Sequence, residues 1–166
     1  KQLLDKKGIF VFEAPYLIDM FDNLTFDTIY HEHLSFLAIR PLKKLFDLFD
    51  LEIFDVKVIS VQGMSIRVFV GHKGEHAIHS IVSRLVKKEL AYGLNKKTSY
   101  INLSKRVESS KNKLLQLLLA LKKKNKRIAA YGAPAKGNTL LSYYKIGTEI
   151  LEYALEDLPS KHGFYT

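Results

Sequence analysis

The chain has 166 residues and 47% of them are hydrophobic, which is enough to bury the core of one ordinary domain, or of one domain and part of another. It contains no cysteine, which excludes disulfides and thiolate metal sites, and no apolar run of about 18 to 20 residues, which excludes a membrane-spanning helix. The net charge of +9 is uneven, because residues 1–70 hold 8 Lys and Arg against 10 Asp and Glu, whereas residues 71–166 hold 18 against 7.

This asymmetry indicates two units, and a basic half admits a polyanionic partner. Solvated Lys-rich helix faces explain the same charge, and we favour that explanation because runs such as "KKKNKR" commonly lie at helix ends. The first ten residues lack a secretory signal, so we expect a cytoplasmic protein. They also lack an initiator Met, which is consistent with a fragment.

The first third of the chain predicts one strand and two helices. The apolar run at Gly8–Glu13 predicts a buried strand that Pro15 ends, and "YLIDMF" predicts one or two helical turns. Residues 23–36 have no clean period and are expected to form a loop. From Pro41 onward, apolar residues recur at helical spacing, which predicts an amphipathic helix with Pro41 in its first position. The apolar residues of this helix are Leu42, Leu45, Phe46 and Phe49.

Two β-rich segments, 51–59 and 64–70, are joined by "SVQG" and predict two successive antiparallel strands. Residues 77–125 have helical spacing, and we expect Gly93 to divide this long segment into two helices. Its apolar stripes are Ile78, Ile81, Val82 and Leu85, followed by Leu103, Val107, Leu114, Leu118 and Leu121.

The last segment predicts a βαβ unit with a parallel pair of strands. "RIAAY" resembles a buried strand, "GAPAKGN" a tight loop, "TLLSYYKI" a helix, and "EILEYALED" the next strand. Two strands and one helix cannot cover a parallel sheet. Either this unit packs on the first one, or residues are missing.

The segment Tyr30–His33 places tyrosine, histidine and glutamate side chains in four consecutive positions. A His-x-His pair can bind a metal, but no third ligand at suitable spacing is evident, so we predict no metal site. His72, His76 and His79 have helical spacing, yet they straddle a predicted loop and helix start. A polar loop with internal hydrogen bonds is the simplest alternative.

Proton transfer is the more specific hypothesis for this segment. A neutral imidazole accepts a proton near neutral pH, and Glu32 or Tyr30 could orient it or hold a substrate hydroxyl. In a strand the imidazole of His33 would face away from Tyr30 and Glu32, and in a helix Glu32 would diverge from the other two. The three side chains can therefore share one substrate only if the backbone bends.

The segment Tyr131–Thr139 ("YGAPAKGNT") is neither a Walker A loop nor a G-x-G-x-x-G motif. Its glycines would still let the backbone approach an anion, and Lys136 supplies positive charge. Asn138 or Thr139 could cap a helix whose exposed N–H groups favour phosphate. An ordinary strand-to-helix turn with a good cap fits the same residues, and the spacing leaves both interpretations open.

Four segments in order, "FDTIYHEHLSF", "GMSIRVFV", "YGAPAKGNTLLSYYKIG" and "SKHGFY", resemble the sugar C-methyltransferase family. Members of that family use S-adenosylmethionine to methylate a ring carbon of a nucleotide-linked keto-deoxysugar. The resemblance covers nearly the whole chain. It implies an α/β fold in which residues 1–76 form the last part of a Rossmann-like methyltransferase domain with closing antiparallel strands, 77–125 a helical linker, and 126–166 the start of a truncated second α/β domain.

The resemblance also implies roles for individual residues. His33 would be the general base beside the sugar ketone, and Tyr30 and Glu32 would hold the sugar and support that base. The nucleotide would lie at the second motif, through Tyr131, Gly132, Lys136, Asn138 and Thr139. No Gly-rich loop after an early strand and no Cys cluster is present, so most of the S-adenosylmethionine site and the family's zinc region are absent from this sequence. The chain alone is therefore expected to be inactive.

Two other functions stay open at this stage. A basic α/β module could bind nucleotides or nucleic acid without chemistry, although few aromatic residues are interleaved with the basic ones to stack on exposed bases. A regulatory or structural remnant could share the fold alone. We expect a nucleotide-linked sugar as partner, and neither a membrane nor nucleic acid.

Overall fold

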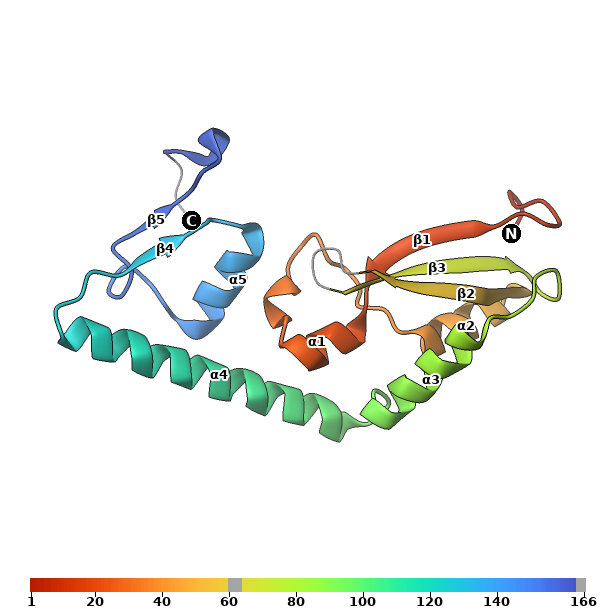
Figure 1. Ribbon diagram of the computed structural model, residues 1–166, viewed down its shortest axis with the longest axis horizontal. Coiled ribbons are helices and arrows are strands. Elements are labelled where there is room, and N and C mark those ends of the chain that lie inside the picture. The colour runs from red at the N-terminus through yellow and green to blue at the C-terminus, as the bar shows by residue number, and fades with distance from the viewer. Residues whose placement is uncertain (60–63, 164–166) are drawn as a thin grey trace. The chain divides into compact units, whose positions relative to one another are not determined.

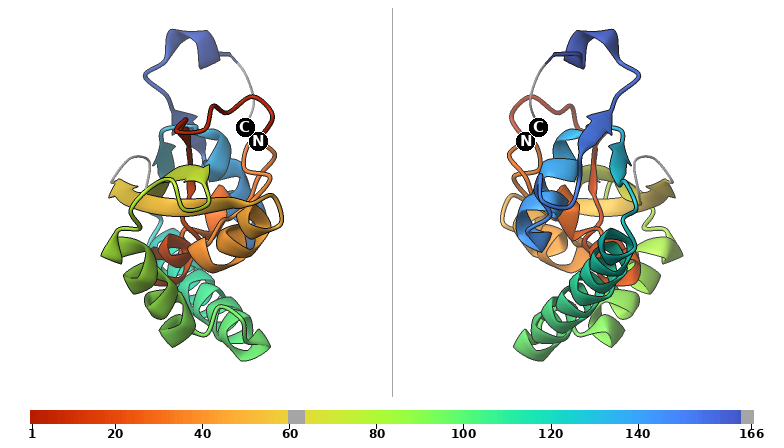
Figure 2. Two further views of the ribbon diagram at one scale, coloured as in Figure 1. Left: turned by 90° about the vertical axis from the view of Figure 1, so that its right-hand side faces the viewer. Right: turned by 90° about the vertical axis from the view of Figure 1, so that its left-hand side faces the viewer.

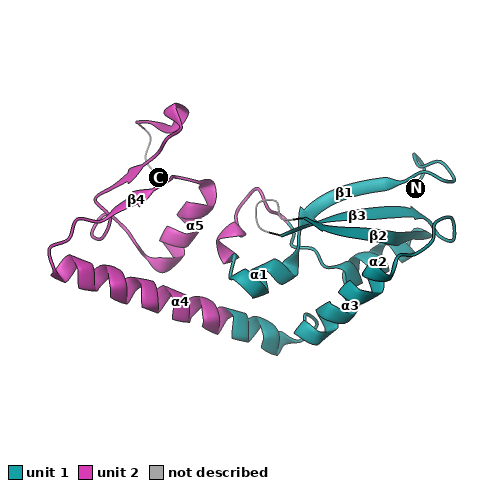
Figure 3. Ribbon diagram, in the orientation of Figure 1, with its two compact units in different colours: residues 1–25, 35–103 teal, residues 26–34, 104–166 magenta. Residues whose placement is uncertain are grey.

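The computed structural model describes residues 1–59 and 64–163 and has the expected mixed α/β character (Figure 1). The chain divides into two compact units, which are coloured separately in Figure 3. The first unit comprises residues 1–25 and 35–103, and the second comprises residues 26–34 and 104–166. The predicted domain limits at residues 76 and 125 concern the family's domains and stay a prediction.

The first unit contains a three-stranded antiparallel sheet in the order β1-β3-β2. Its strands are β1 (Phe10–Pro15), β2 (Leu51–Ile59) and β3 (Ser65–His72). The predicted antiparallel succession of β2 and β3 is confirmed, while the "SVQG" turn between them lies outside the described residues. Strand β3 lies in the centre, so its backbone pairs on both sides.

Helices α2 (Ile39–Asp47) and α3 (Ser80–Tyr92) lie on the same side of this sheet (Figures 1 and 2). Alternate side chains of the strands point toward them, as the two-residue period of a strand requires. Ile53, Ile66 and Val68 are fully buried in this core. The core of the first unit therefore lies between strands β2 and β3 and the two helices.

Three sequence expectations need correction here. Strand β1 begins at Phe10, two residues later than predicted, and it is not buried: α2 and α3 pack mainly over β2, and Phe10 and Val11 stay about half exposed. Leu45 and Phe49 are exposed although they fit the predicted apolar stripe: only one side of α2 meets the sheet, and Phe49 lies beyond the end of the helix at Asp47. Ile78 is also exposed, because α3 starts after it.

Helix α2 begins at Ile39, two residues before Pro41, and a distant carboxylate explains the early start. Its N-cap residue, Ala38, makes no side-chain hydrogen bond. Instead the buried Glu89 of α3 accepts hydrogen bonds from the backbone N–H groups of Ile39 (2.6 Å) and Arg40 (2.8 Å). The Tyr16 hydroxyl donates to the same carboxylate at 3.1 Å, and burial, together with the Glu89 charge, raises the pKa of this phenol. The first N–H groups of the helix are thus satisfied from outside it.

The predicted division at Gly93 is confirmed. Gly93 has a φ of 68°, a left-handed conformation that glycine adopts without steric cost, and it ends α3. Helix α4 (Lys97–Lys123) follows, and its first turns belong to the first unit while the rest belongs to the second. The predicted helical turns after Pro15 are also present, as α1 (Leu17–Asn23).

The second unit contains the predicted βαβ arrangement, with β4 (Ala129–Tyr131) and β5 (Tyr153–Leu155) paired in parallel. Helix α5 (Ala135–Tyr144) connects them. Two short 3-10 turns complete the unit, η1 (Phe26–Thr28) and η2 (Pro159–Lys161). Most side chains of β4 and β5 are exposed, which contradicts the expectation that "RIAAY" forms a buried strand.

Candidate functional site

The Tyr30–His33 segment forms a tight turn directly after η1, so the predicted bend is present. The His33 N–H donates to the Tyr30 carbonyl at 2.9 Å and closes the turn. The Tyr30 ring lies edge-on to the rings of both histidines, with its centroid 4.9 Å from that of His33 and 5.5 Å from that of His31. Tyr30 and His33 are half-buried, whereas His31 and Glu32 are exposed. The turn therefore brings Tyr30 and His33 together and leaves His31 in solvent.

Glu32 contacts the tyrosine of this turn. The Tyr30 hydroxyl donates to the Glu32 carboxylate at 2.9 Å, and this hydrogen bond raises the pKa of Tyr30. The phenol consequently stays protonated at neutral pH, and its ring is held between the carboxylate and the imidazole. We infer that Glu32 orients Tyr30.

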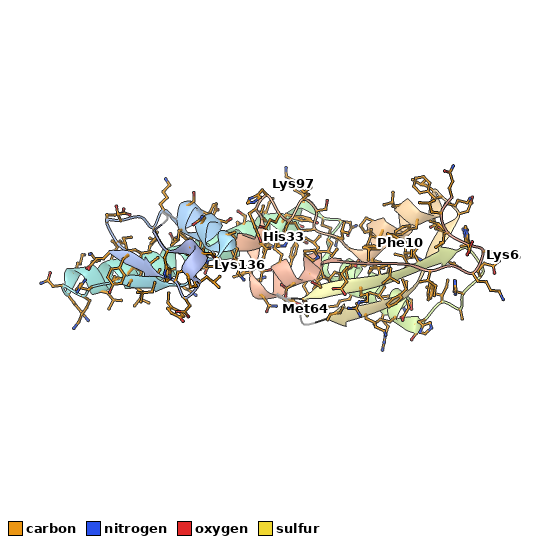
Figure 4. The ribbon with its side chains drawn as sticks, turned by 90° about the horizontal axis from the view of Figure 1, so that it is seen from above. Lys6, Phe10, His33, Met64, Lys97 and Lys136 are labelled. Atoms are coloured by element: carbon orange, nitrogen blue, oxygen red, sulfur yellow. The ribbon has the colours of Figure 1, made fainter. Side chains whose placement is uncertain are left out.

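The backbone selects one tautomer of His33. Its Nδ1 lies 2.9 Å from the Thr28 carbonyl oxygen, which can only accept, so Nδ1 carries the proton. In the neutral ring the lone pair then resides on Nε2. A histidine fixed in this way presents a defined proton acceptor, as a general base requires. The position of His33 is labelled in Figure 4.

The second predicted motif, residues 131–139, is a strand end, a short loop and the first turn of α5. Gly132 has a φ of 86°, and its N–H donates to the Leu155 carbonyl at 2.7 Å, so glycine is required at this position. Lys136, labelled in Figure 4, is exposed in the first turn of the helix. Tyr131 is 75% exposed, and its hydroxyl donates to Asp157, which raises the pKa of Tyr131.

The prediction that Asn138 or Thr139 caps α5 is wrong. The helix begins at Ala135, so both residues lie inside it, and Pro134 occupies the N-cap position without a side-chain hydrogen bond. The Pro134 carbonyl accepts from Gly137 N–H at 2.8 Å. Proline lacks an N–H group and has a restricted φ, which suits it to the start of a helix. The sequence pattern did not reveal this earlier start of α5.

A hollow of about 1340 Å³ lies beside this motif in the second unit. Of the predicted substrate-binding residues, Gly132 and Asn138 line it, while Tyr131, Lys136 and Thr139 do not. Polar side chains from the helix end and from the segment after β5 also contribute: Lys145, Glu149, Glu156, Lys161 and His162. Its size and mixed lining suit a ligand as large as a nucleotide.

Sequence reasoning missed Glu156 and Lys161. Glu156 accepts hydrogen bonds from the N–H groups of Ala133 (2.8 Å) and Leu158 (3.1 Å), and these bonds, with the Lys161 ammonium, lower the pKa of its carboxyl group. Lys161 also donates to the Ala133 carbonyl at 2.9 Å. The signal was available, because Glu156 follows β5 directly and loops at the carboxyl ends of parallel strands meet at one edge of the sheet.

The three histidines with helical spacing do not converge. His72 Nε2 lies 3.1 Å from the Leu4 carbonyl, His76 stacks on Phe54, and His79 lies near Asp55. Within residues 1–59 and 64–163, no group of three His, Cys, Asp or Glu side chains is placed to hold a metal ion. None of the helices in the same ranges combines the length and apolar character that crossing a bilayer requires.

Comparison with known proteins points to one family. Residues 60–166 match the family described as C-methyltransferase C-terminal domain. The chain is also 31% identical over 162 residues to the C-methyltransferase NovU of Streptomyces niveus. This similarity covers 97% of the present chain and 39% of that relative, so the chain spans well under half of the relative's length.

Proposed function

The chain belongs to the family of C-methyltransferase C-terminal domains, and from that premise we propose that it serves methyl transfer to a ring carbon of a nucleotide-linked keto-deoxysugar. In this proposal His33 is the general base, Tyr30 and Glu32 hold the sugar, and the hollow beside α5 receives the nucleotide. The main support for this role of His33 is the contact between its Nδ1 and the Thr28 carbonyl, which places the proton acceptor of the neutral ring at Nε2.

The proposed chemistry of this chain is the removal of a proton from the carbon beside the sugar ketone. Nε2 of His33 takes that proton, and the electron pair of the C–H bond becomes the enolate. The Tyr30 hydroxyl gives its one proton to Glu32, so its oxygen can accept a hydrogen bond from a sugar hydroxyl. A positioned general base contributes about 10²- to 10⁴-fold to such a step.

S-adenosylmethionine is the expected methyl donor, and it would supply the methyl group to the deprotonated carbon. The described residues of the first unit do not fit most of its site, because both strand pairings of their sheet are antiparallel and such cofactors bind at loops after parallel strands. The cofactor residues are therefore expected outside this sequence. We expect no methyl transfer by the 166-residue chain alone, and clear turnover would contradict this assignment.

The nucleotide half of the substrate is assigned to the hollow in the second unit. Lys145, Lys161 and the first N–H groups of α5 offer charge and donors to a diphosphate. Lys136 is exposed in the same first turn and can reach an anion from the solvent side. Gly132 keeps the loop free of a side chain where the ligand would approach.

The proton-removal step can be tested without the methyl donor. The chain is incubated in D₂O with a nucleoside-diphosphate 4-keto-6-deoxyglucose, and the proton beside the ketone is followed by ¹H NMR. We expect catalysed exchange by the natural sequence. His33→Gln should lower the exchange rate by about 10²- to 10⁴-fold, which corresponds to about 3–5 kcal/mol of barrier.

His31→Gln is the matched control, because it removes an exposed imidazole two residues away and should leave the rate within about twofold. Unchanged exchange in the His33 variant would remove His33 from the mechanism. Nucleotide binding without any exchange by the natural sequence would favour the non-catalytic binding module instead.

A further inference from the structure

The turn at Tyr30–His33 is attached to α5 through Phe26, which begins the segment "FDTIYHEHLSF" but was given no role in the sequence analysis. The Phe26 ring stacks on Tyr144, with centroids 5.5 Å apart and an interplanar angle of 21°. It also meets Tyr143 at 5.5 Å in a tilted arrangement of 59°. Tyr144 is only 3% exposed, so the stack is well shielded from solvent. Residues 26–34 consequently belong to the same compact unit as α5.

The surface that receives Phe26 is itself held in place. The Tyr143 hydroxyl donates to Glu108 of α4 at 2.9 Å, and this bond raises the pKa of Tyr143. The Lys111 ammonium lies 5.1 Å from the centre of the Tyr143 ring, a distance at which cation–π attraction acts. The tyrosine pair therefore offers a fixed platform rather than two mobile rings.

A short covalent path leads from this platform to the imidazole. Phe26 is the first residue of η1, and its carbonyl accepts from Ile29 N–H at 3.0 Å. Thr28, the last residue of η1, offers one carbonyl to two donors, Tyr30 N–H at 3.0 Å and His33 Nδ1 at 2.9 Å. The orientation of the imidazole thus depends on a carbonyl two residues from the stacked ring.

We propose that Phe26 is a positioning residue for His33: its stack on Tyr144 sets the Thr28 carbonyl, and that carbonyl sets the tautomer and plane of the imidazole. Phe26 touches no reacting atom in this arrangement. The proposal rests on the proposed function only in taking His33 as the base.

Helix α5 gives this arrangement a second consequence. Tyr144 ends the helix, while the loop proposed for the nucleotide precedes Ala135 at its start. Nine residue steps along an α-helix measure about 14 Å, so α5 fixes the spacing between the anchor of the base and the nucleotide loop. One rigid element would then hold both halves of the substrate site in register.

The first test is spectroscopic and independent of activity. In the ¹⁵N-labelled chain, histidine side-chain spectra distinguish the Nδ1–H from the Nε2–H tautomer. We expect pure Nδ1–H for His33 in the natural sequence and in Phe26→Tyr, which keeps the ring. Phe26→Ala should give a mixture of tautomers. A pure Nδ1–H signal in Phe26→Ala would overturn the proposal.

The second test uses deuterium exchange into the keto-deoxysugar. Phe26→Ala should lower kcat at least tenfold and leave KM within twofold, since misplacing a catalytic group by about 1 Å can cost about 10²-fold. Phe26→Tyr should restore kcat to within threefold, and Phe49→Ala, which removes an exposed phenylalanine of the first unit, should change neither constant. A rise in the KM of Phe26→Ala with kcat unchanged would contradict a positioning role for Phe26.

The two tests separate the two proposals. If the natural sequence gives no deuterium exchange, the proposed function fails, and the tautomer spectra still decide the role of Phe26. Should Phe26→Ala unfold, Phe26→Leu carries both tests, because it nearly keeps the volume and loses the flat ring. An unchanged tautomer and kcat in Phe26→Leu would refute the role of the stack.

Discussion

The sheets of the two units are built on different principles. In the first unit the central strand β3 is paired on both sides, and Ile66 and Val68 are completely buried. In the second unit the parallel pair β4–β5 leaves Tyr131 and Leu155 at 75% and 51% exposure. The first sheet is held by side-chain packing, and the second by backbone pairing and polar contacts at its carboxyl end. The proposed chemistry lies with the second.

Two glutamates repeat the same contrast. Glu89 and Glu156 each accept hydrogen bonds from two backbone N–H groups. Those of Glu89 come from the start of α2, and those of Glu156 come from Ala133 before α5 and Leu158 after β5. Glu89 is almost completely buried, whereas the Glu156 side chain is 15% exposed and lines the hollow. A hydrogen bond from a backbone N–H to the carboxylate should therefore contribute more to the free energy of unfolding in the first unit, because an unsatisfied buried donor is costly.

The largest expected effect comes from truncating the packed sheet. Ile66→Ala should lower the free energy of unfolding of the first unit by about 3 kcal/mol, since a buried isoleucine leaves a cavity. Leu155→Ala, on the exposed parallel pair, should cost less than about 0.5 kcal/mol. Urea titrations followed by amide NMR signals of each unit measure both. Equal losses would remove the contrast between the sheets.

A smaller effect is expected from the buried carboxylate. In Glu89→Gln one carboxylate oxygen becomes an NH₂ donor, so either Arg40 N–H or the Ile39 and Tyr16 donors lose their acceptor. The same titration should give a loss of about 2 kcal/mol. Glu52→Gln is the control, because Glu52 accepts a single exposed bond from Gly74 N–H, and it should change stability by less than about 0.5 kcal/mol. A similar cost in both variants would count against the buried cap.

The smallest effect concerns pH at the loop before α5. The hydrogen bonds from Ala133 and Leu158 lower the pKa of Glu156, so its contribution to stability is present above the unfolded pKa and is lost as pH falls through the folded one. The Ala133 amide signal should shift and lose protection from hydrogen exchange as pH falls from about 5 to 3. In Glu156→Gln this transition should vanish. An identical transition in the variant would assign it to another group.

Local patterns predicted much of this fold. The β2–β3 succession, the break at Gly93 and the βαβ unit follow from period, turn residues and a left-handed glycine, which are properties of neighbouring residues. The early start of α2 was not predictable in this way, because it depends on Glu89, 50 residues along the chain from Ile39. The exposure of β1 likewise depends on where α2 and α3 pack on the sheet.

The candidate site also combines features that neighbouring residues predict with features that depend on distant contacts. The bend at Tyr30–His33 followed from its missing period, and the glycine at position 132 from the loop pattern. The docking of Phe26 on Tyr144 joins positions far apart in the chain, and Glu156 acts on a loop 23 residues before it. Such pairings depend on tertiary structure, so neither period nor spacing could reveal them.

The Thr28 carbonyl behind His33 has a kinetic consequence. A carboxylate in its place would form an ion pair with the ring once it had gained a proton and would retain that proton firmly. A neutral amide oxygen offers only a dipole, so in the proposed mechanism this contact adds no ion pair that would slow the return of the proton to solvent. The rate at which the proposed base returns its proton to solvent should then respond to the buffer concentration.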